Sequence, residues 1–309
     1  MTRIDETEIS PLNATQALTA PRSRWRSKPA GRNTADRVRG LTKHALLIAV
    51  GAVMLYPLLW MLASSFKPES VIFSDPSLWP SEWDFSHYAK GWNALAHPFS
   101  LFLTNSAIVV AGALIGNLLT CSMAAYAFAR LRFRGSKILF AAMLLTLMLP
   151  IHVVLVPQYV VFSNIGWVNT FLPLIVPKFL ATDAFFIFLM VQFFRSLPRE
   201  LDEAAKLDGA GYWRTYFQVL LPLSVPALAT TAIFTFIWTW NDFFAQLIYL
   251  TKPAVQTAPV ALRNYVDATS GASWGSLFAM SIVTLIPVFI VFLIGQRYLV
   301  KGIATTGLK

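Results

Sequence analysis

Residues 200–222 read ELDEAAKLDGAGYWRTYFQVLLP, and this charged stretch interrupts a strongly apolar half of the chain. It contains four of the fifteen acidic residues, and long apolar segments precede and follow it. The fold depends on whether lipid or protein covers those apolar segments. If lipid covers them, the role of the charged stretch depends on which side of the membrane it faces.

The composition is that of a membrane protein. Hydrophobic residues make up 56% of the 309 residues and charged residues only 13%, whereas a soluble domain carries about 25% charged residues. Such a chain cannot cover its surface with polar groups, so we predict that lipid covers much of it. The lone Cys121 excludes an internal disulfide and a cysteine metal site, and we expect no cofactor.

Six segments with few or no charged residues are long enough to cross a membrane, which takes about 20 helical residues for about 30 Å of hydrocarbon. They are Ala45–Phe66, Leu101–Ala129, Ile138–Phe162, Phe171–Phe194, Leu223–Leu250 and Leu277–Gln296. Strands of an outer-membrane barrel would instead show alternating segments of about 10 residues. The sequence therefore predicts an all-α integral membrane protein with six transmembrane helices.

The basic residues predict the orientation, because cytoplasmic connections of membrane proteins are rich in Lys and Arg. Of the 25 Lys and Arg residues, 20 lie in the N-terminal tail, the 130–137 loop, the 195–222 loop and the C-terminal tail. Both termini and the charged stretch are therefore expected to be cytoplasmic. This distribution accounts for the net charge of +10 by topology and by attraction to anionic lipid, so we expect no nucleic acid partner.

The chain is predicted to have three parts. Residues 1–43 are rich in Ser, Thr, Pro, Ala and Arg without an apolar stripe, which predicts a disordered basic cytoplasmic tail. Residues 44–300 form the six-helix domain, and residues 301–309 form a cytoplasmic C-terminal tail. Within the second apolar segment, Gly112 and Gly116 form a GxxxG motif, which predicts a close packing face, more readily inside this bundle than against a partner subunit.

The charged stretch itself is predicted to form two short helices joined by a reversal. Acidic residues at its start favour a helix N-terminus, and Gly209 and Gly211 permit a sharp turn. Tyr212–Leu221 then carries an apolar stripe. From composition alone, an interfacial loop that merely connects two helices remains open.

The spacing of residues in this stretch resembles the EAA loop of ATP-binding-cassette (ABC) importer permeases. Glu203-Ala-Ala is followed after three residues by Gly209, and after nine more by Val219-x-Leu-Pro222. The family pattern has Ile where this chain has Val219. Trp240-Asn-Asp-Phe243 resembles a motif of sugar-importer permeases, and Gln296–Gly302 resembles the C-terminus of the smaller permease of maltose-type systems.

The resemblance implies a type I ABC importer permease in a bacterial cytoplasmic membrane. The partners it implies are a second permease, two cytoplasmic ATPases and an extracytoplasmic binding protein that delivers a sugar. The chain has no GxxxxGK[ST] motif to cradle ATP phosphates, so it is not expected to be an enzyme. The residues expected to couple it to the ATPase are Glu203, Ala204, Ala205, Asp208, Gly209, Leu221 and Pro222.

Three polar residues in apolar segments are candidates for the solute pathway, because charges within membrane helices are usually functional. They are Asp183, Asn241 and Asp242. Asp242 is expected near the outer mouth, where capping or a bond to a neighbouring helix is an alternative to solute contact. Lys178 lies five residues before Asp183, which is a poor helical pairing unless the region of Pro177 is irregular.

Other functions are weighed against this one. Relatives of this kind also carry glycerol phosphates and other polyols, so these solutes stay open. A secondary carrier would show inverted internal repeats, and an intramembrane hydrolase would need a nucleophile and a base; we find neither pattern. We also expect the polar outer connection Thr251–Gly275 to reach toward the binding protein, as the resemblance implies.

Overall fold

The structure is a computed structural model that describes residues 34–266 and 273–306. Every regular element in these ranges is a helix, which confirms the predicted all-α class. The chain divides into two units after Tyr56; the first contains the beginning of α1, and the second contains the rest of α1 and the elements that follow it.

The helices have the following bounds. In chain order they are α1 (Thr34–Ser64), η3 (Glu69–Val71), α2 (Ser86–Asn93), α3 (Phe99–Arg130), α4 (Ser136–Thr146), α5 (Ile151–Asn164), α6 (Leu172–Ile175), η4 (Val176–Leu180), α7 (Ala184–Ser196), α8 (Glu200–Leu207), α9 (Tyr212–Arg214), η5 (Thr215–Leu220), α10 (Leu221–Leu223), α11 (Val225–Asn241), α12 (Phe244–Tyr249), η6 (Pro253–Val255), α13 (Ala258–Arg263), η7 (Asn264–Val266) and α14 (Trp274–Thr306). Of the short elements, η5 is a π-helix, and η3, η4, η6 and η7 are 3₁₀-helices.

Within the described ranges, several helices are long and apolar enough to cross a membrane. The four single candidates are Arg39–Ser64, Phe99–Arg130, Leu172–Ser196 and Trp274–Tyr298. Two more candidates are bent pairs, Ser136–Thr146 with Ile151–Asn164 at 99° and Tyr212–Leu223 with Val225–Asn241 at 77°. The candidate spans therefore number four, or six if each bent pair is one span.

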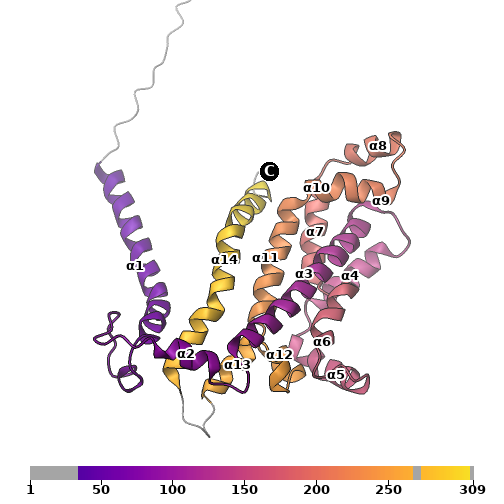
Figure 1. The fold of residues 1–309 in the computed structure, drawn as a ribbon. Coiled ribbons are helices and arrows are strands. Elements are labelled where there is room, and N and C mark those ends of the chain that lie inside the picture. The colour runs from indigo at the N-terminus through magenta and orange to yellow at the C-terminus, as the bar shows by residue number, and fades with distance from the viewer. Residues whose placement is uncertain (1–33, 267–272, 307–309) are drawn as a thin grey trace, which may run out of the picture. The chain divides into compact units, whose positions relative to one another are not determined.

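The centre of the second unit is a helical bundle. Helix α3 packs against α7 and α11, and α11 packs against α14, as Figure 1 shows. Met190, Val191 and Phe194 of α7 are fully buried against Ala125 and Tyr126 of α3. This core holds α3 and α7 together at the end of the bundle that carries α8.

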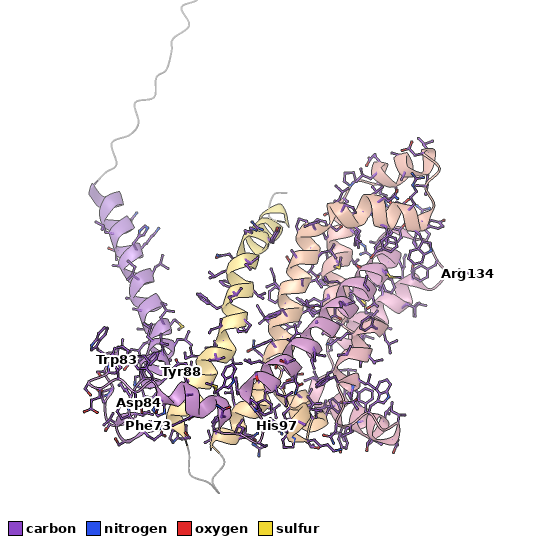
Figure 2. The ribbon with its side chains drawn as sticks, viewed as in Figure 1. Phe73, Trp83, Asp84, Tyr88, His97 and Arg134 are labelled. Atoms are coloured by element: carbon purple, nitrogen blue, oxygen red, sulfur yellow. The ribbon has the colours of Figure 1, made fainter. Side chains whose placement is uncertain are left out.

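The connections of the second unit gather at two ends of the bundle. Helices α8, α9 and α10 lie at one end with the C-terminal end of α14, whereas α2, α5, α12 and α13 lie at the other (Figure 1). Figure 2 shows Phe73, Trp83, Asp84 and Tyr88 at this second end and Arg134 toward the first. The 195–222 connection and the end of α14 thus lie at one end of the bundle, which agrees with the prediction that these Lys- and Arg-rich parts face the same side.

The GxxxG motif lets α3 approach the segment that precedes α7. A Cβ atom added at Gly112 would lie 2.8 Å from the Ile175 side chain, and one at Gly116 would lie 2.9 Å from the Lys178 carbonyl carbon. Both contacts are inside this chain, so the predicted packing face within the bundle is confirmed.

The substitution Gly116→Ala is therefore expected to destabilise the protein by about 1–3 kcal/mol, because the new methyl group meets backbone that has little room to move. Thermal unfolding of the purified protein in detergent measures the change. Gly51→Ala is the matched control, since a Cβ there has no neighbour within 4 Å. Equal stability of the two variants would contradict the packing account.

Several predicted boundaries differ from the structure. The Ile138–Phe162 segment is divided before Pro150, the N-cap of α5, because a residue that precedes proline avoids helical geometry; its two helices form one candidate span if the bent pair is counted together. Helix α1 begins at Thr34, earlier than the predicted boundary at residue 44, and α14 continues to Thr306. Most of the predicted tail, residues 1–33, lies outside the described residues.

The described part of the expected outer connection Thr251–Gly275 is exposed at Thr251–Ala254 and packs into the bundle from Gln256 onward. Ala258, Val260 and Ala261 of α13 are buried, and the Ala258 amide donates a hydrogen bond to Ser106 Oγ at 3.0 Å. Asn105 Nδ2 also donates to the carbonyl of Gln256, at 2.8 Å. The apolar residues of this short helix are therefore buried, whereas the sequence predicts a polar loop.

Candidate functional site

The 196–222 segment begins with helix α8, whose end is fixed by a glycine. Gly209 has φ of 73°, and its amide donates to the Lys206 carbonyl at 3.0 Å. The next amide, of Ala210, donates to the Ala205 carbonyl at 2.8 Å. These two bonds and the left-handed glycine are the Schellman ending of a helix, and they turn the chain back at the predicted position.

The exposed tip of α8 differs from the predicted one. Leu207 is 90% exposed, and Glu203, Ala204 and Asp208 are exposed beside it. Ala205, in contrast, is buried. Adjacent residues of a helix point about 100° apart, so Ala205 packs inward although Ala204 is exposed, and it does not offer close contact to a partner. The exposure of Leu207 is not among the predictions from the sequence, although an apolar residue two positions before Gly209 is a signal for it.

The second half of the segment bends sharply into α11. Pro222 has no amide hydrogen, and the π-helix η5 directly precedes α10, which contains it. Ser224 Oγ donates to the Leu220 carbonyl at 2.7 Å. Tyr216 and Leu220 of the predicted apolar stripe are buried. The segment is thereby held at 77° to α11, with Leu221 partly buried and Pro222 exposed at the bend.

Other members of the stripe remain at the surface. Trp213 and Phe217 stack on each other at a centroid distance of 6.1 Å, and both are more than a third exposed. Together with Leu207 they give the segment an apolar outer surface.

A second group of polar side chains, which we call the polar cluster, lies inside the bundle. It consists of Asn117, Lys178, Asp183 and Thr235. Lys178 Nζ lies 2.8 Å from Asp183 Oδ2, and Asn117 Nδ2 donates to the same oxygen at 2.6 Å and to Thr235 Oγ1 at 3.2 Å. The cluster joins α3, η4, the start of α7 and α11.

The pairing of Lys178 with Asp183 depends on an irregular backbone. Lys178 lies in the 3₁₀-helix η4, and Ala181 has φ of 53°, a left-handed conformation that is uncommon for residues other than glycine. The helix therefore breaks before Asp183, which is the N-cap of α7. The break meets the condition under which residues five apart can pair.

The polar cluster lies part-way along the length of the bundle. Asn117 is about 27 Å from the first residue of α3 and about 20 Å from the last at 1.5 Å per residue. The side chains of Lys178 and Asp183 are 28% and 24% exposed. One side of this ion pair is therefore open in the single chain, as expected for a group that meets a partner, water or a solute.

The other two candidates lie at the α11–α12 junction. Asn241 Nδ2 donates to the Ile237 carbonyl of its own helix at 2.8 Å. Asp242 Oδ1 accepts from the Ala245 amide at 3.2 Å, which is the capping role weighed as an alternative to solute contact. Asp242 ends α11 in an extended conformation, so the expected fifth span Leu223–Leu250 is divided here.

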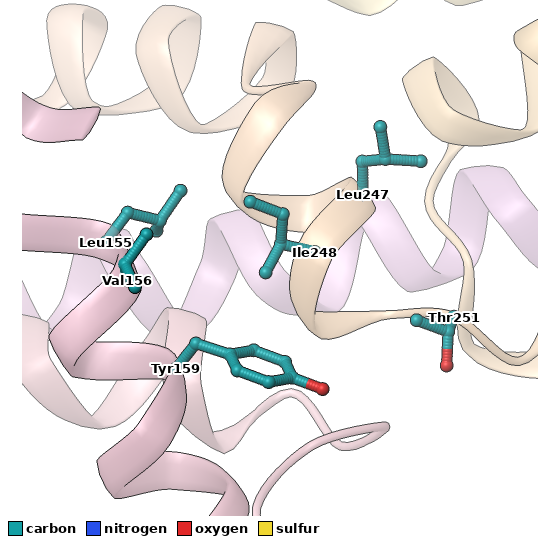
Figure 3. Close-up of a pocket in the computed structure, with 6 residues that line it drawn as sticks. All are labelled: Leu155, Val156, Tyr159, Leu247, Ile248 and Thr251. Atoms are coloured by element: carbon teal, nitrogen blue, oxygen red, sulfur yellow. The ribbon is translucent and has the colours of Figure 1, made fainter. Parts of the chain in front are cut away.

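A cavity of about 360 Å³ lies at the end of the bundle away from α8. Its lining residues are Leu155, Val156, Tyr159, Leu247, Ile248 and Thr251 (Figure 3). Only two of these side chains carry a hydroxyl group, and that of Thr251 already donates to Asn169 Oδ1 at 2.9 Å. This mostly apolar lining offers a sugar few hydrogen-bond partners, so the lining gives no support for a solute site here.

Comparison with known proteins identifies close relatives by sequence. The chain is 36% identical over 272 residues to the diacetylchitobiose uptake system permease protein NgcG of Streptomyces coelicolor, covering 88% of this chain and 89% of that one. It is 31% identical over 270 residues to the trehalose/maltose transport system permease protein MalG of Thermococcus litoralis, covering 85% and 96%. It is 33% identical over 269 residues to the sn-glycerol-3-phosphate transport system permease protein UgpE of Yersinia pestis, covering 84% and 94%.

A solved structure and a protein-family model also match this chain. A chain from the crystal structure of a bacterial ABC transporter involved in the import of the acidic polysaccharide alginate has a TM-score of 0.75 at 24% identity, covering 85% of this chain and 97% of that one. The two chains share a fold. The family described as binding-protein-dependent transport system inner membrane component matches residues 116–305, a range that includes the 196–222 segment and the polar cluster. The chain therefore belongs to the family of binding-protein-dependent transport system inner membrane components.

Proposed function

We propose that this chain is one of two permease subunits that form the pore of an ATP-driven importer in a bacterial cytoplasmic membrane. The solute is a carbohydrate that an extracytoplasmic binding protein delivers. The observation that carries the proposal is the family match over residues 116–305, together with relatives named for diacetylchitobiose and for trehalose and maltose. The relative named for sn-glycerol-3-phosphate favours a polyol phosphate as the second candidate solute.

The proposed topology has six spans with both termini in the cytoplasm. Two observations support it. Lys and Arg residues are concentrated in the four connections assigned to that side. In the second unit, the C-terminal end of α14 lies at the same end of the bundle as the 196–222 segment (Figure 1).

The 196–222 segment is proposed to dock on one of two cytoplasmic ATPases. The chain lacks a phosphate-binding loop, so energy for transport must arrive through a protein contact. Leu207 provides an apolar side chain that is 90% exposed, and an aliphatic side chain can serve as the anchor that enters a partner's pocket. Exposed Glu203 and Asp208 are suited to basic groups around that pocket, while Gly209 and Pro222 set the direction of the tip.

The polar cluster is proposed to lie beside the solute pathway, which this chain shares with the second permease. Its support is the open side of the Lys178–Asp183 pair about half-way along a bundle of apolar helices, where an ionisable residue normally serves a function. Asn241, which is exposed at the end of α11, is proposed to line the outer part of the same pathway.

A ligand screen of the cognate binding protein tests the solute. Diacetylchitobiose, trehalose, maltose and sn-glycerol-3-phosphate are added separately, and thermal unfolding is followed. A true solute at a hundred times its dissociation constant stabilises the folded state by about 2.7 kcal/mol, so we expect one carbohydrate to raise the unfolding temperature clearly. Stabilisation by sn-glycerol-3-phosphate alone would favour the second candidate.

Transport of the stabilising solute then tests the permease. Uptake should disappear when this chain is deleted, and liposomes that contain the full complex should require ATP. Uptake by this chain alone in liposomes without ATP would instead identify a secondary carrier.

A further inference from the structure

One face of helix α3 is joined to the 196–222 segment by polar contacts at regular spacing. The contacts are Ser122 Oγ with Tyr216 Oη at 2.6 Å, Tyr126 Oη to the Tyr212 carbonyl at 3.1 Å, and Arg130 Nη1 to Asp202 Oδ2 at 2.8 Å. Helical residues four apart lie on one face. The three contacts therefore attach successive turns of α3 to η5, α9 and α8 in turn.

Arg130 also joins these elements to α7. Its Nη2 donates to the carbonyls of Phe194 and Leu197 at 2.6 and 2.8 Å, at the end of α7, where carbonyls lack helical partners. The Arg130 side chain is only 4% exposed, and that of Asp202 is 18% exposed. A planar guanidinium holds several acceptors in fixed directions, so this one group sets α8 against both α3 and α7.

The same helix carries the polar cluster. About 20 Å from Arg130 along α3, Asn117 donates to Asp183, and Thr120 Oγ1 donates to the Lys178 carbonyl at 2.8 Å. Gly116, directly before Asn117, lets the backbone of α3 approach the backbone at Lys178. A displacement of α3 along or about its axis would therefore displace the ion pair.

We infer that Arg130 is a positioning residue for energy coupling, which fixes α8 to α3 so that movement of the α8 tip moves the polar cluster. The inference rests on the proposed function, in which an ATPase engages that tip. Without the guanidinium, α8 keeps its chain connections and the tyrosine contacts, but it can tilt without moving α3. Docking then survives while the coupling of hydrolysis to transport is lost.

Substitutions of Asp202 provide the mild test, because they leave the buried Arg130 in place. The complete importer is reconstituted in liposomes with its ATPase, second permease and binding protein. The transported solute is radiolabelled diacetylchitobiose, or whichever solute stabilises the binding protein in the ligand screen. The number of solute molecules imported per ATP hydrolysed is measured. With Asp202→Asn, we expect the ATPase to co-purify as in the parent and this ratio to fall about tenfold, the size of a typical coupling between sites.

Three further variants separate coupling from stability. Arg130→Lys keeps the positive charge but loses the planar guanidinium that binds several acceptors at once, and we expect it to lower the ratio as Asp202→Asn does. Asp202→Glu keeps a carboxylate and should retain most of the coupling. Glu200→Gln removes a charge from an exposed residue of the same helix turn and should leave the ratio unchanged.

The ratio separates the possible outcomes, because it does not depend on how much complex survives purification. If Asp202→Asn and Arg130→Lys reduce the amount of complex but import as much solute per ATP as the parent, the contact only supports the fold and the inference is wrong. If the parent complex itself fails to bind the ATPase, the proposed function is wrong and the inference is wrong with it.

Discussion

A complex that carries Leu207→Asp is expected to lose its ATPase during purification. Leu207 is 90% exposed at the end of α8, and removal of a central apolar anchor from an interface typically costs about 2–4 kcal/mol. At about 1.4 kcal/mol per factor of ten, this corresponds to a fall in affinity of roughly 30- to 1,000-fold. A carboxylate in the same pocket adds the cost of removing a charge from water.

Co-purification of the ATPase with the membrane subunits measures the effect. Leu207→Met is the matched control, since it keeps an apolar side chain of similar volume and should retain the ATPase. Because the side chain lies at the surface of this chain, neither substitution should disturb the folding of the permease. Retention of the ATPase by Leu207→Asp at the parental level would show that the tip of α8 is not the docking point.

Asp183→Leu is expected to destabilise the permease by about 1–3 kcal/mol, less than the cost of leaving one member of a fully buried ion pair without its partner, because the side chains of Lys178 and Asp183 are 28% and 24% exposed. It removes both the 2.8 Å contact of Lys178 and the acceptor of Asn117. Thermal unfolding in detergent measures the loss. An unfolding temperature equal to that of the parent would mean that the pair does not stabilise this bundle.

The double substitution Lys178→Met with Asp183→Leu separates the structural and functional roles of the pair. Replacing both members of a buried ion pair by apolar residues is often neutral, so we expect most of the stability to return. Solute uptake should remain lost if the pair acts in the pathway. Recovery of both stability and uptake would assign the pair a purely structural role.

The sequence predicts most of the fold, including the break at Pro150, but not the break at Ala181. The positions of the apolar helices follow from hydrophobicity and length, and Pro150 marks one break directly because of its backbone chemistry. The break at Ala181 has no such signal, since alanine seldom adopts φ near 53°. For this reason, the sequence predicts the pairing of Lys178 with Asp183 only if the backbone near Pro177 is irregular.

The 196–222 segment shows the same division. The glycine turn follows from local chemistry, because the positive φ of Gly209 suits glycine. The burial of Ala205 and the exposure of Leu207 do not, because they depend on how α8 rolls against the end of the bundle. The sequence shows Arg130 only as one of several basic residues of a connection, since its contact with Asp202 joins residues far apart in the chain.

Photo-crosslinking from position 207 in intact membranes tests the central claim most directly. A photoreactive amino acid in place of Leu207 should form an adduct with an ATP-binding subunit. The same group in place of Phe73, which is exposed at the opposite end of the bundle, should form none. If position 207 gives no adduct with the ATPase in cells that still import the solute, or if position 73 gives one, then the 196–222 segment is not the element through which this permease receives energy.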